Sequence, residues 1–144
     1  MWVPTMTPEE QHQFVHGGTW IGKLGTYGAD GTIRMTPLQY AEHDDVIWFD
    51  TWDSSAAAKN IRRDPRASVL IDSPAPPFRG VHLTGEAEVH PATTTPEEYA
   101  DRFAAYIEDR EAALRMIVML RNIAPRVEIS FRPNKMLTWD LGKL

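Results

Sequence analysis

The stretch 46–72 constrains the fold of this chain more than any other. Residues 46–49 are uninterrupted apolar residues, too few for a helix and rich in β-branched and aromatic side chains, which predicts a buried strand. Residues 53–58 combine N-cap residue types with alanines and predict the start of a helix. That helix must end just before Pro65, because proline disfavours the helical conformation of the residue that precedes it. Alternating apolar and polar residues at 67–72 predict a second strand.

The predicted helix carries positive charge close behind its N-terminus. Lys59, Arg62 and Arg63 follow the hydroxyl groups of residues 54 and 55. A helix N-terminus offers free N–H groups and a partial positive charge, so nearby cations can complete an anion site. The same three charges are equally typical of a solvated helix face. From the residues alone, both interpretations stay open.

Short strands make up most of the remaining chain. Glycine, proline and aspartate clusters separate them, as in the tight turn expected at 28–31. The clearest strand alternates at 81–89, with one apolar face and one polar face. The expected strands are 19–27, 32–41, 46–49, 67–72, 81–89 and 127–132, and residues 133–134 should turn the chain into 135–139.

Two capping boxes predict helices outside these strands. Thr7 with Glu10, and Thr95 with Glu98, each precede a helical pattern whose first position is a proline. The first of these helices should end at the glycines 17–18. The chain thus predicts a small antiparallel barrel or open sheet with flanking helices.

A third helix, expected at 111–122, is apolar nearly all the way round. A helix packed on only one side does not need such a pattern. Together with the apolar strand at 46–49, it offers more hydrophobic surface than one small barrel covers. We therefore expect a homodimer, with any cofactor slot where the two barrels meet.

Composition narrows the functions that the chain can perform. Its 144 residues suffice for one domain, taken as 1–144, and 15 basic against 20 acidic residues give a net charge of −5, which argues against nonspecific nucleic-acid binding. The absence of cysteine excludes disulfides, thiolate metal sites and a cysteine nucleophile. No apolar run approaches the ~18 residues that cross a membrane, and no signal-like segment follows Met1. We therefore expect a cytoplasmic protein with no membrane partner.

The sequence shows no acid–base or nucleophilic machinery of its own. It has no Gly-x-Ser-x-Gly motif, and no carboxylate pair stands out. His12 and His16 have the spacing of metal ligands on one helix face, but no third ligand is evident, so we interpret them as surface residues and predict no metal site. No catalytic residue is predicted either. A chain of this kind suits an enzyme whose cofactor performs the chemistry.

Several segments resemble the split β-barrel flavin and deazaflavin oxidoreductases, which include the pyridoxamine 5'-phosphate oxidase-like proteins. The most specific is the run Lys-Asn-Ile-Arg-Arg-Asp-Pro-Arg-Ala-Ser-Val-Leu-Ile-Asp at 59–72. The others follow in the family's order, namely a hairpin at 25–31, a cofactor-lining strand at 35–38 and a later strand at 78–81 with 85–87. The closest resemblance is to the branch that binds coenzyme F420. It implies a mainly β fold, a six-stranded antiparallel split barrel of the FMN-binding type with helices at its ends.

The resemblance also implies where a cofactor would bind. Its ring would lie against Met35, Thr36, Pro37 and Leu38. The ribityl chain and phosphate would lie near Thr51, Trp52 and Ser55. Lys59, Asn60 and Arg62 would hold the phosphate end, with Arg79 beside the mouth of the site. From the residues alone, 36–38 is as typical of an ordinary edge strand, because proline removes one ladder donor.

One departure from the family pattern favours coenzyme F420 over flavin mononucleotide (FMN). The family usually places a basic residue, or an Arg-Lys pair, in the first turn of the helix, where this chain has Ala56 and Ala57. This loss weakens the binding of a single phosphate most, whereas the acidic tail of F420 can interact with several basic residues. The favoured function is therefore an F420-dependent oxidoreductase that transfers a hydride to a small conjugated or apolar substrate. The alternatives are an FMN-dependent oxidoreductase of the same fold, and a non-catalytic flavin-binding or haem-binding protein, the latter using His82 or His43.

Overall fold

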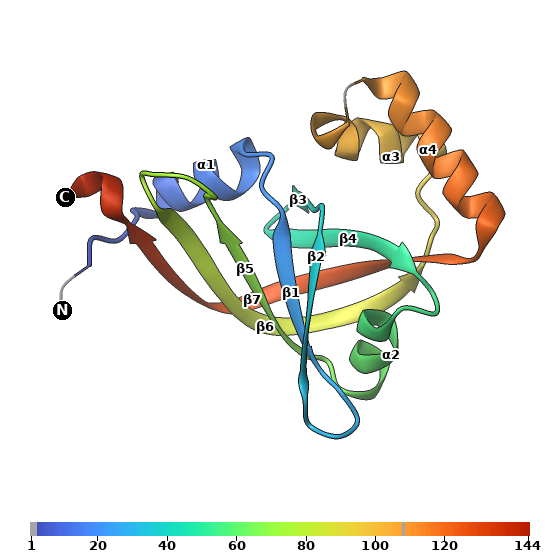
Figure 1. Ribbon diagram of the computed structural model, residues 1–144, viewed down its shortest axis with the longest axis horizontal. Helices are drawn as coiled ribbons and strands as arrows, with labels where there is room; N and C mark the ends of the chain where they lie inside the picture. Colours follow the sequence, from blue (N-terminus) through green and yellow to red (C-terminus); the bar gives the residue numbers. More distant parts are fainter. Residues whose placement is uncertain (1–2, 108) are drawn as a thin grey trace.

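In the part of the chain that the structure describes, residues 3–107 and 109–144, seven strands form one curled antiparallel sheet (Figure 1). The structure is a computed structural model. The strand order across the sheet is β2-β1-β5-β6-β7-β4-β3. The strands are β1 (Gly22–Tyr27), β2 (Ile33–Leu38), β3 (Ala41–His43), β4 (Val46–Trp52), β5 (Arg66–Asp72), β6 (Arg79–Pro91) and β7 (Arg126–Asp140). The helices are α1 (Pro8–Gly17), α2 (Ala56–Arg63), α3 (Pro96–Phe103) and α4 (Arg110–Ile123), with 3-10 turns at Ala104–Tyr106 and Leu141–Lys143.

The predicted mainly β fold with flanking helices is confirmed, but the predicted number of six strands is wrong. The described residues contain a seventh strand, β3, whose three residues pair with β4. Residues Asp44 and Asp45 form the tight turn between them, both with positive φ, at 53° and 62°. A strand of three residues is too short to show an alternating apolar and polar pattern in the sequence. Its formation depends on pairing with the neighbouring strand β4.

The turn expected at 133–134 is also wrong, because β7 continues through it. Pro133 pairs with Gly85 and Lys135 with Thr84, so Asn134 is an extra residue on β7 and forms a β-bulge. A bulge tolerates proline, since the ladder of hydrogen bonds is already interrupted there. A Cβ atom at Gly85 would collide with the carbonyl group of the facing strand, so the close approach requires glycine.

The helix boundaries follow the local signals in the sequence. Both capping boxes are present, with the backbone N–H of Glu10 donating to Thr7 Oγ1 at 3.2 Å and that of Glu98 donating to Thr95 Oγ1 at 3.1 Å. The predicted strand, helix and strand of 46–72 are β4, α2 and β5. Ser55 caps α2, which ends before Pro65 as expected. The helix expected at 111–122 is α4.

The main core lies on one face of the sheet, under α1 and α2. The predicted alternation of β5 and β6 is confirmed, because one side of each strand is buried and the other is more exposed. Core side chains from the sheet and α2 include Leu24, Phe49, Ala57, Ile61, Val69, Ile71, Val81, Leu83, Ile129 and Phe131. No helix of the described residues covers the opposite face of β1, β5 and β6 (Figure 1).

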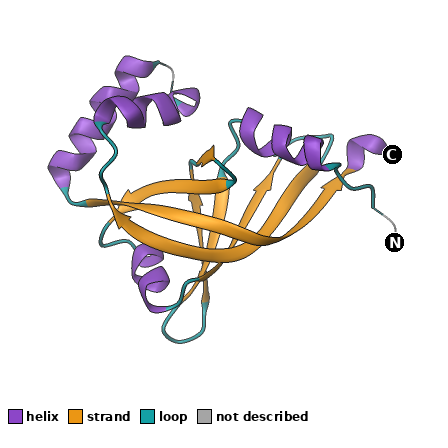
Figure 2. Ribbon diagram, turned by 180° about the vertical axis from the view of Figure 1, so that it is seen from behind, coloured by secondary structure: helices purple, strands orange, loops and turns teal. Residues whose placement is uncertain are grey.

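Helices α3 and α4 form a hairpin that extends from the end of the sheet (Figure 2). They pack on each other through a small core of their own around Tyr99, Phe103 and Ile117. One side of α4 stays exposed, including Met119 and Ile123. No helix in the described part of the chain has the length and hydropathy that a membrane crossing requires.

Buried charges lie where this hairpin meets the sheet. Arg126 of β7 pairs with Asp50 of β4, and their side chains are only 8% and 4% exposed. The Arg126 guanidinium also stacks over the Trp52 ring, with its Cζ 4.3 Å from the ring centroid. Burial raises the pKa of the Asp50 carboxyl, against the opposing attraction of Arg126.

Glu128 of β7 is a second buried carboxyl. We expect its protonation to make the stability of the protein depend on pH. Burial raises the pKa of Glu128, although Arg102 lowers it in part. A raised pKa in the folded state contributes stability that is present below the ordinary carboxyl value of about 4 and is lost as the pH rises through the folded pKa. Glu128→Gln, which mimics the protonated acid, should therefore gain stability relative to the wild type as the pH rises from 4 to 7. Urea unfolding of both proteins at several pH values measures this difference, and a constant difference would contradict the assignment.

Candidate cofactor site

The exposed face of the sheet carries a row of small side chains. Gly25 pairs with Met35 on one side and with Ser68 on the other, and Ser68 pairs in turn with Thr84. Because side chains alternate between the two faces of each strand, these residues lie on the face opposite the core residue Leu24. Three neighbouring strands thus contribute glycine, serine and threonine side by side. Because these side chains are small, they leave space above this part of the sheet.

A cavity of about 840 Å³ lies over this row. Its apolar walls are Ile33, Met35, Leu70, Leu137 and Trp139. Its charged and polar lining includes Lys23, Arg66, His82 and Glu86. A Cβ atom at Gly25 would lie only 3.1 Å from the Met35 sulfur, so a larger residue at this position would push the Met35 side chain aside. A small floor between apolar walls suits a flat, conjugated ring.

Charged side chains at the rim of the cavity are held in place by partners. Lys23 Nζ lies 2.6 Å from Asp72 Oδ1, and both side chains are half-exposed. The Arg66 guanidinium stacks over Tyr27, with its Cζ 4.7 Å from the ring centroid. Arg66 also pairs with Asp64 at 2.7 Å. These partners orient the cations at the rim. An anionic group of a cofactor could therefore bind to them there.

The four residues expected along the ring divide between the two faces of β2. Met35 lines the cavity. Pro37 is exposed and pairs with Lys23. Thr36 faces the other way, since it pairs with Leu24, and Leu38 packs against the main core. Only Met35 of this group reaches the cavity through its side chain.

The residues expected near the ribityl chain lie at the junction of β4 and α2, away from the cavity lining. Thr51 is buried and pairs with Val127. Trp52 is half-buried under the Arg126 guanidinium. Ser55 is the N-cap residue of α2, and its Oγ accepts a hydrogen bond from the backbone N–H of Ala58 at 3.1 Å. Trp52 and Ser55 thus have structural partners for their side chains, and Thr51 is buried within the sheet.

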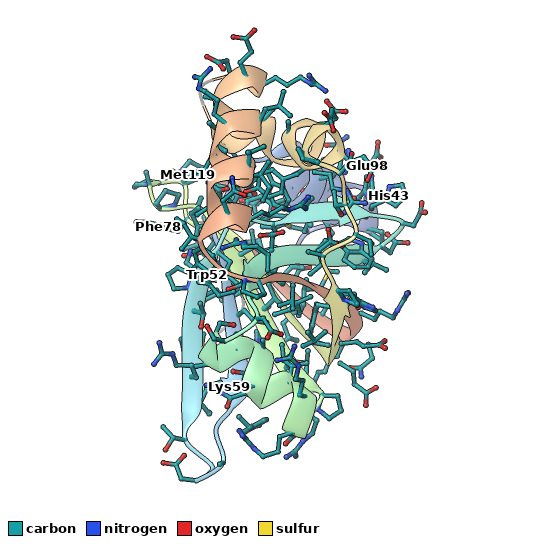
Figure 3. The ribbon with its side chains drawn as sticks, turned by 90° about the vertical axis from the view of Figure 1, so that its right-hand side faces the viewer. His43, Trp52, Lys59, Phe78, Glu98 and Met119 are labelled. Atoms are coloured by element: carbon teal, nitrogen blue, oxygen red, sulfur yellow. The ribbon has the colours of Figure 1, made fainter. Side chains whose placement is uncertain are left out.

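The polar residues of α2 differ in what they already contact. Asn60 is buried, and its Nδ2 donates to Thr26 Oγ1 at 3.1 Å, so it joins α2 to a strand that lines the cavity. Arg62 pairs with Asp53 and donates to its carbonyl oxygen at 3.1 Å. The Lys59 side chain is exposed and has no hydrogen-bond or ion-pair partner among the described residues (Figure 3). Arg63, which was not predicted to bind the cofactor, donates to Asn60 Oδ1 at 2.7 Å and to the Tyr27 carbonyl at 3.1 Å.

Arg79 lies in a different hollow, between α1 and the start of β6. Its Cζ is 5.4 Å from the centroid of the Phe14 ring, and its Nε is buried with no hydrogen-bond partner among the described residues. Glu10 and Asp140 line the same hollow. The structure therefore does not bring Arg79 together with Met35.

The two alanines that depart from the family pattern, Ala56 and Ala57, differ in burial. Ala57 is 2% exposed and belongs to the main core, so a long basic side chain at this position would displace core packing. Ala56 is exposed. The first turn of α2 thus has no cation, and the positive charge of this helix begins at Lys59.

Most of the cavity floor was not predicted from the sequence. The sequence shows a polar face at 81–89 and a glycine at 25, but nothing in it connects the two. The available signal was the alternation of 66–72 and 81–89, which identifies the face but not the register. Only the pairing of Gly25 with Ser68, and of Ser68 with Thr84, shows that the small residues form one row.

Comparisons with known proteins agree with this architecture. A conserved hypothetical protein from Mycobacterium tuberculosis has a similar structure, with a TM-score of 0.80, 28% identity and coverage of 98% of this chain and 88% of that one. An F420 reductase matches with a TM-score of 0.70, 22% identity and coverage of 91% and 98%. The haem storage protein HutZ from Vibrio cholerae matches with a TM-score of 0.70, 13% identity and coverage of 93% and 96%. A family profile described as pyridoxamine 5'-phosphate oxidase matches residues 7–140, and the chain therefore belongs to that family, within the split-barrel flavin and deazaflavin superfamily that its sequence resembles.

Proposed function

We propose that this protein is an F420-dependent oxidoreductase that transfers a hydride to a small conjugated or apolar substrate. The observation that carries the proposal is the row of small side chains under the apolar cavity. A conjugated ring fits such a floor, because its faces are apolar and its edge is polar. The deazaflavin would supply the hydride, so the protein has to bind, orient and shield the ring. The similarity to an F420 reductase supports this choice.

An FMN-dependent oxidoreductase is the second candidate, and the contacts of α2 favour it less. FMN presents a single phosphate, which would need a dedicated cation or several donors. Arg62 and Arg63 already have partners, so Lys59 is the cation of α2 with none among the described residues. A cofactor with several anionic groups can instead spread them over several cations, such as Lys23 and Arg66 at the rim of the cavity.

A haem-binding or non-catalytic role is the third candidate, and one histidine gives it a specific observation. His82 lines the cavity, and imidazole is a common haem ligand. His43, the other histidine considered, lies at the end of β3, and its Nε2 is 3.1 Å from Asp44 Oδ2. Haem binding would therefore depend on His82.

Equilibrium binding to the apo-protein tests the proposal. F420, FMN and haemin are titrated separately, each followed by its own absorption or fluorescence. We expect F420 to bind most tightly and FMN more weakly or not at all. FMN or haemin binding more tightly than F420 would overturn the proposal, and haemin binding lost in His82→Ala would support the third candidate.

We also propose that the protein is a homodimer, with the cofactor cavity at the subunit interface. Ile33 and Leu137 on the walls of the cavity are 61% and 54% exposed, and Met119 of α4 is 55% exposed. Met119 lies on the same side of the molecule as the exposed Phe78 (Figure 3). Exposed apolar side chains of this kind favour a protein interface. Obligate dimers bury about 2,000 Å² or more. Sedimentation equilibrium at micromolar concentration should give twice the chain mass, and a monomer would contradict the proposal.

Lys59 should hold part of the anionic end of the cofactor. Lys59→Ala should weaken F420 binding by about 1–3 kcal/mol, the contribution of a charge-assisted hydrogen bond, and should leave stability nearly unchanged. Arg62→Ala is the matched control, and it should weaken binding less because Arg62 is engaged with Asp53. Titration of F420 into both variants compares them. An unchanged dissociation constant for Lys59→Ala would remove Lys59 from the site.

A further inference from the structure

Two segments far apart in the sequence bring metal-ligand side chains together at the edge of the sheet. His12 and His16 lie one turn apart on α1, and their rings stack with centroids 5.4 Å apart. Glu42 of β3 and Asp45 of the β3–β4 turn lie against the same helix. The sequence predicted no metal site because the histidine pair had no third ligand, and the fold supplies two carboxylates.

The ligand atoms are close enough to share one ion. One atom each from His12, Glu42 and Asp45 lies within 4.8 Å of the other two. Ligands around a tetrahedral Zn²⁺ ion are about 3.4 Å apart, given bond lengths near 2.1 Å. His12 and Asp45 are exposed, so small side-chain rotations can close the remaining gap without a change in the backbone.

Glu42 is the fixed member of the group. Its side chain is 8% exposed, and its Oε2 lies 2.7 Å from His16 Nδ1. Its Oε1 accepts from the backbone N–H of Asp45 at 2.8 Å. A carboxylate oxygen has two lone pairs, so both oxygens retain the capacity to bind an ion. His16 thereby orients a ligand, as residues around protein metal sites commonly do.

The charge of this hollow favours a cation. Its described lining consists of His12, His16, Glu42, His43, Asp44 and Asp45, without a lysine or an arginine. Its charged groups are therefore three carboxylates, and an arginine, Arg102, lies in the adjacent hollow that Glu42 also lines. The combination of imidazole and carboxylate suits Zn²⁺ and related transition metals, whereas Ca²⁺ and Mg²⁺ prefer oxygen ligands alone.

We propose that His12, Glu42 and Asp45 bind a divalent transition-metal ion of the Zn²⁺ type, with His16 positioning Glu42. The bound ion would join α1 to the β3–β4 hairpin. Three protein ligands leave the fourth position of the ion to water. The lining of this hollow shares no residue with that of the cofactor cavity among the described residues, so the proposal does not depend on the cofactor.

Calorimetric titration of ZnCl₂ into tag-free, chelator-treated protein tests the site. We expect one Zn²⁺ per chain, and no binding of Ca²⁺ or Mg²⁺ at the same concentrations. His12→Asn, Glu42→Gln and Asp45→Asn should each weaken Zn²⁺ binding by at least about 10-fold, since loss of even an orienting partner costs about 10–100-fold. Two matched controls should bind as the wild type does, namely Glu9→Gln on the same helix and His43→Asn in the same hollow.

Thermal unfolding provides a second measurement that does not depend on calorimetry. Zn²⁺ should raise the Tm of the wild type and of both controls, because an ion that binds only the native state stabilises it. At the same Zn²⁺ concentration, the Tm of folded His12→Asn and Asp45→Asn should rise less than that of the wild type. The absence of a Zn²⁺ effect in the wild type would overturn the site. A loss of binding in His43→Asn with retention in His12→Asn would overturn the ligand set.

Discussion

Ser68→Trp should abolish cofactor binding while leaving the sheet folded. Ser68 lies in the middle of the small-residue row, between Gly25 and Thr84, on the floor of the cavity. An indole at this position would occupy the space that a flat ring requires, and the affinity for F420 should fall by at least about 100-fold, which is about 2.7 kcal/mol. Tryptophan is a favourable residue in strands, so the sheet can accept it.

The matched control is Glu88→Trp, which places the same side chain on β6 outside the cavity lining. Titration of F420 into both variants, with circular dichroism as a check of folding, separates blockage of the floor from a general effect of tryptophan. Retention of wild-type affinity by Ser68→Trp would show that the ring binds elsewhere. Loss of affinity in both variants would point to disruption of the sheet instead.

Asp50→Leu should destabilise the protein by about 3–5 kcal/mol, because it leaves the buried charge of Arg126 without its partner. Asp50 and Arg126 are almost fully buried, and Arg121 lies near enough to influence the Asp50 carboxyl. Removal of the carboxylate thus leaves two neighbouring cations that repel each other. Urea denaturation with a two-state analysis measures the loss.

The double variant Asp50→Leu with Arg126→Met is the control for this prediction. An apolar pair of similar volume removes both buried charges, and such replacements are often neutral or stabilising. The double variant should therefore recover most of the stability that the single variant loses. A loss of less than about 1 kcal/mol in Asp50→Leu would mean that the pair behaves as an exposed ion pair.

The sequence by itself determined the features that depend on neighbouring residues. Thr7 and Thr95 begin their helices, and Pro65 ends α2, because capping bonds and proline sterics act within a few residues. Alternation identified the core faces of β5 and β6 for the same reason. The run at 59–72 was specific enough to indicate the family.

Other features required the tertiary structure. The bulge at Asn134 arises because β7 must follow β6 along its whole length, which no local signal near Pro133 reveals. The α2 cations looked equivalent in the sequence, yet Arg62 is paired with Asp53 while Lys59 has no partner among the described residues. Pairing of this kind depends on which segment lies opposite.

Both candidate sites combine residues that only the tertiary structure brings together. Gly25, Ser68 and Thr84 form one floor only because the register of three strands aligns them, and a shift by one residue would turn each strand's side chains to the other face. His12 acquires carboxylate neighbours only because the β3–β4 hairpin folds against α1. The sequence determines the periodicity of each strand and helix through local sterics, whereas the register and the contacts between distant segments are decided by the packing of the whole sheet.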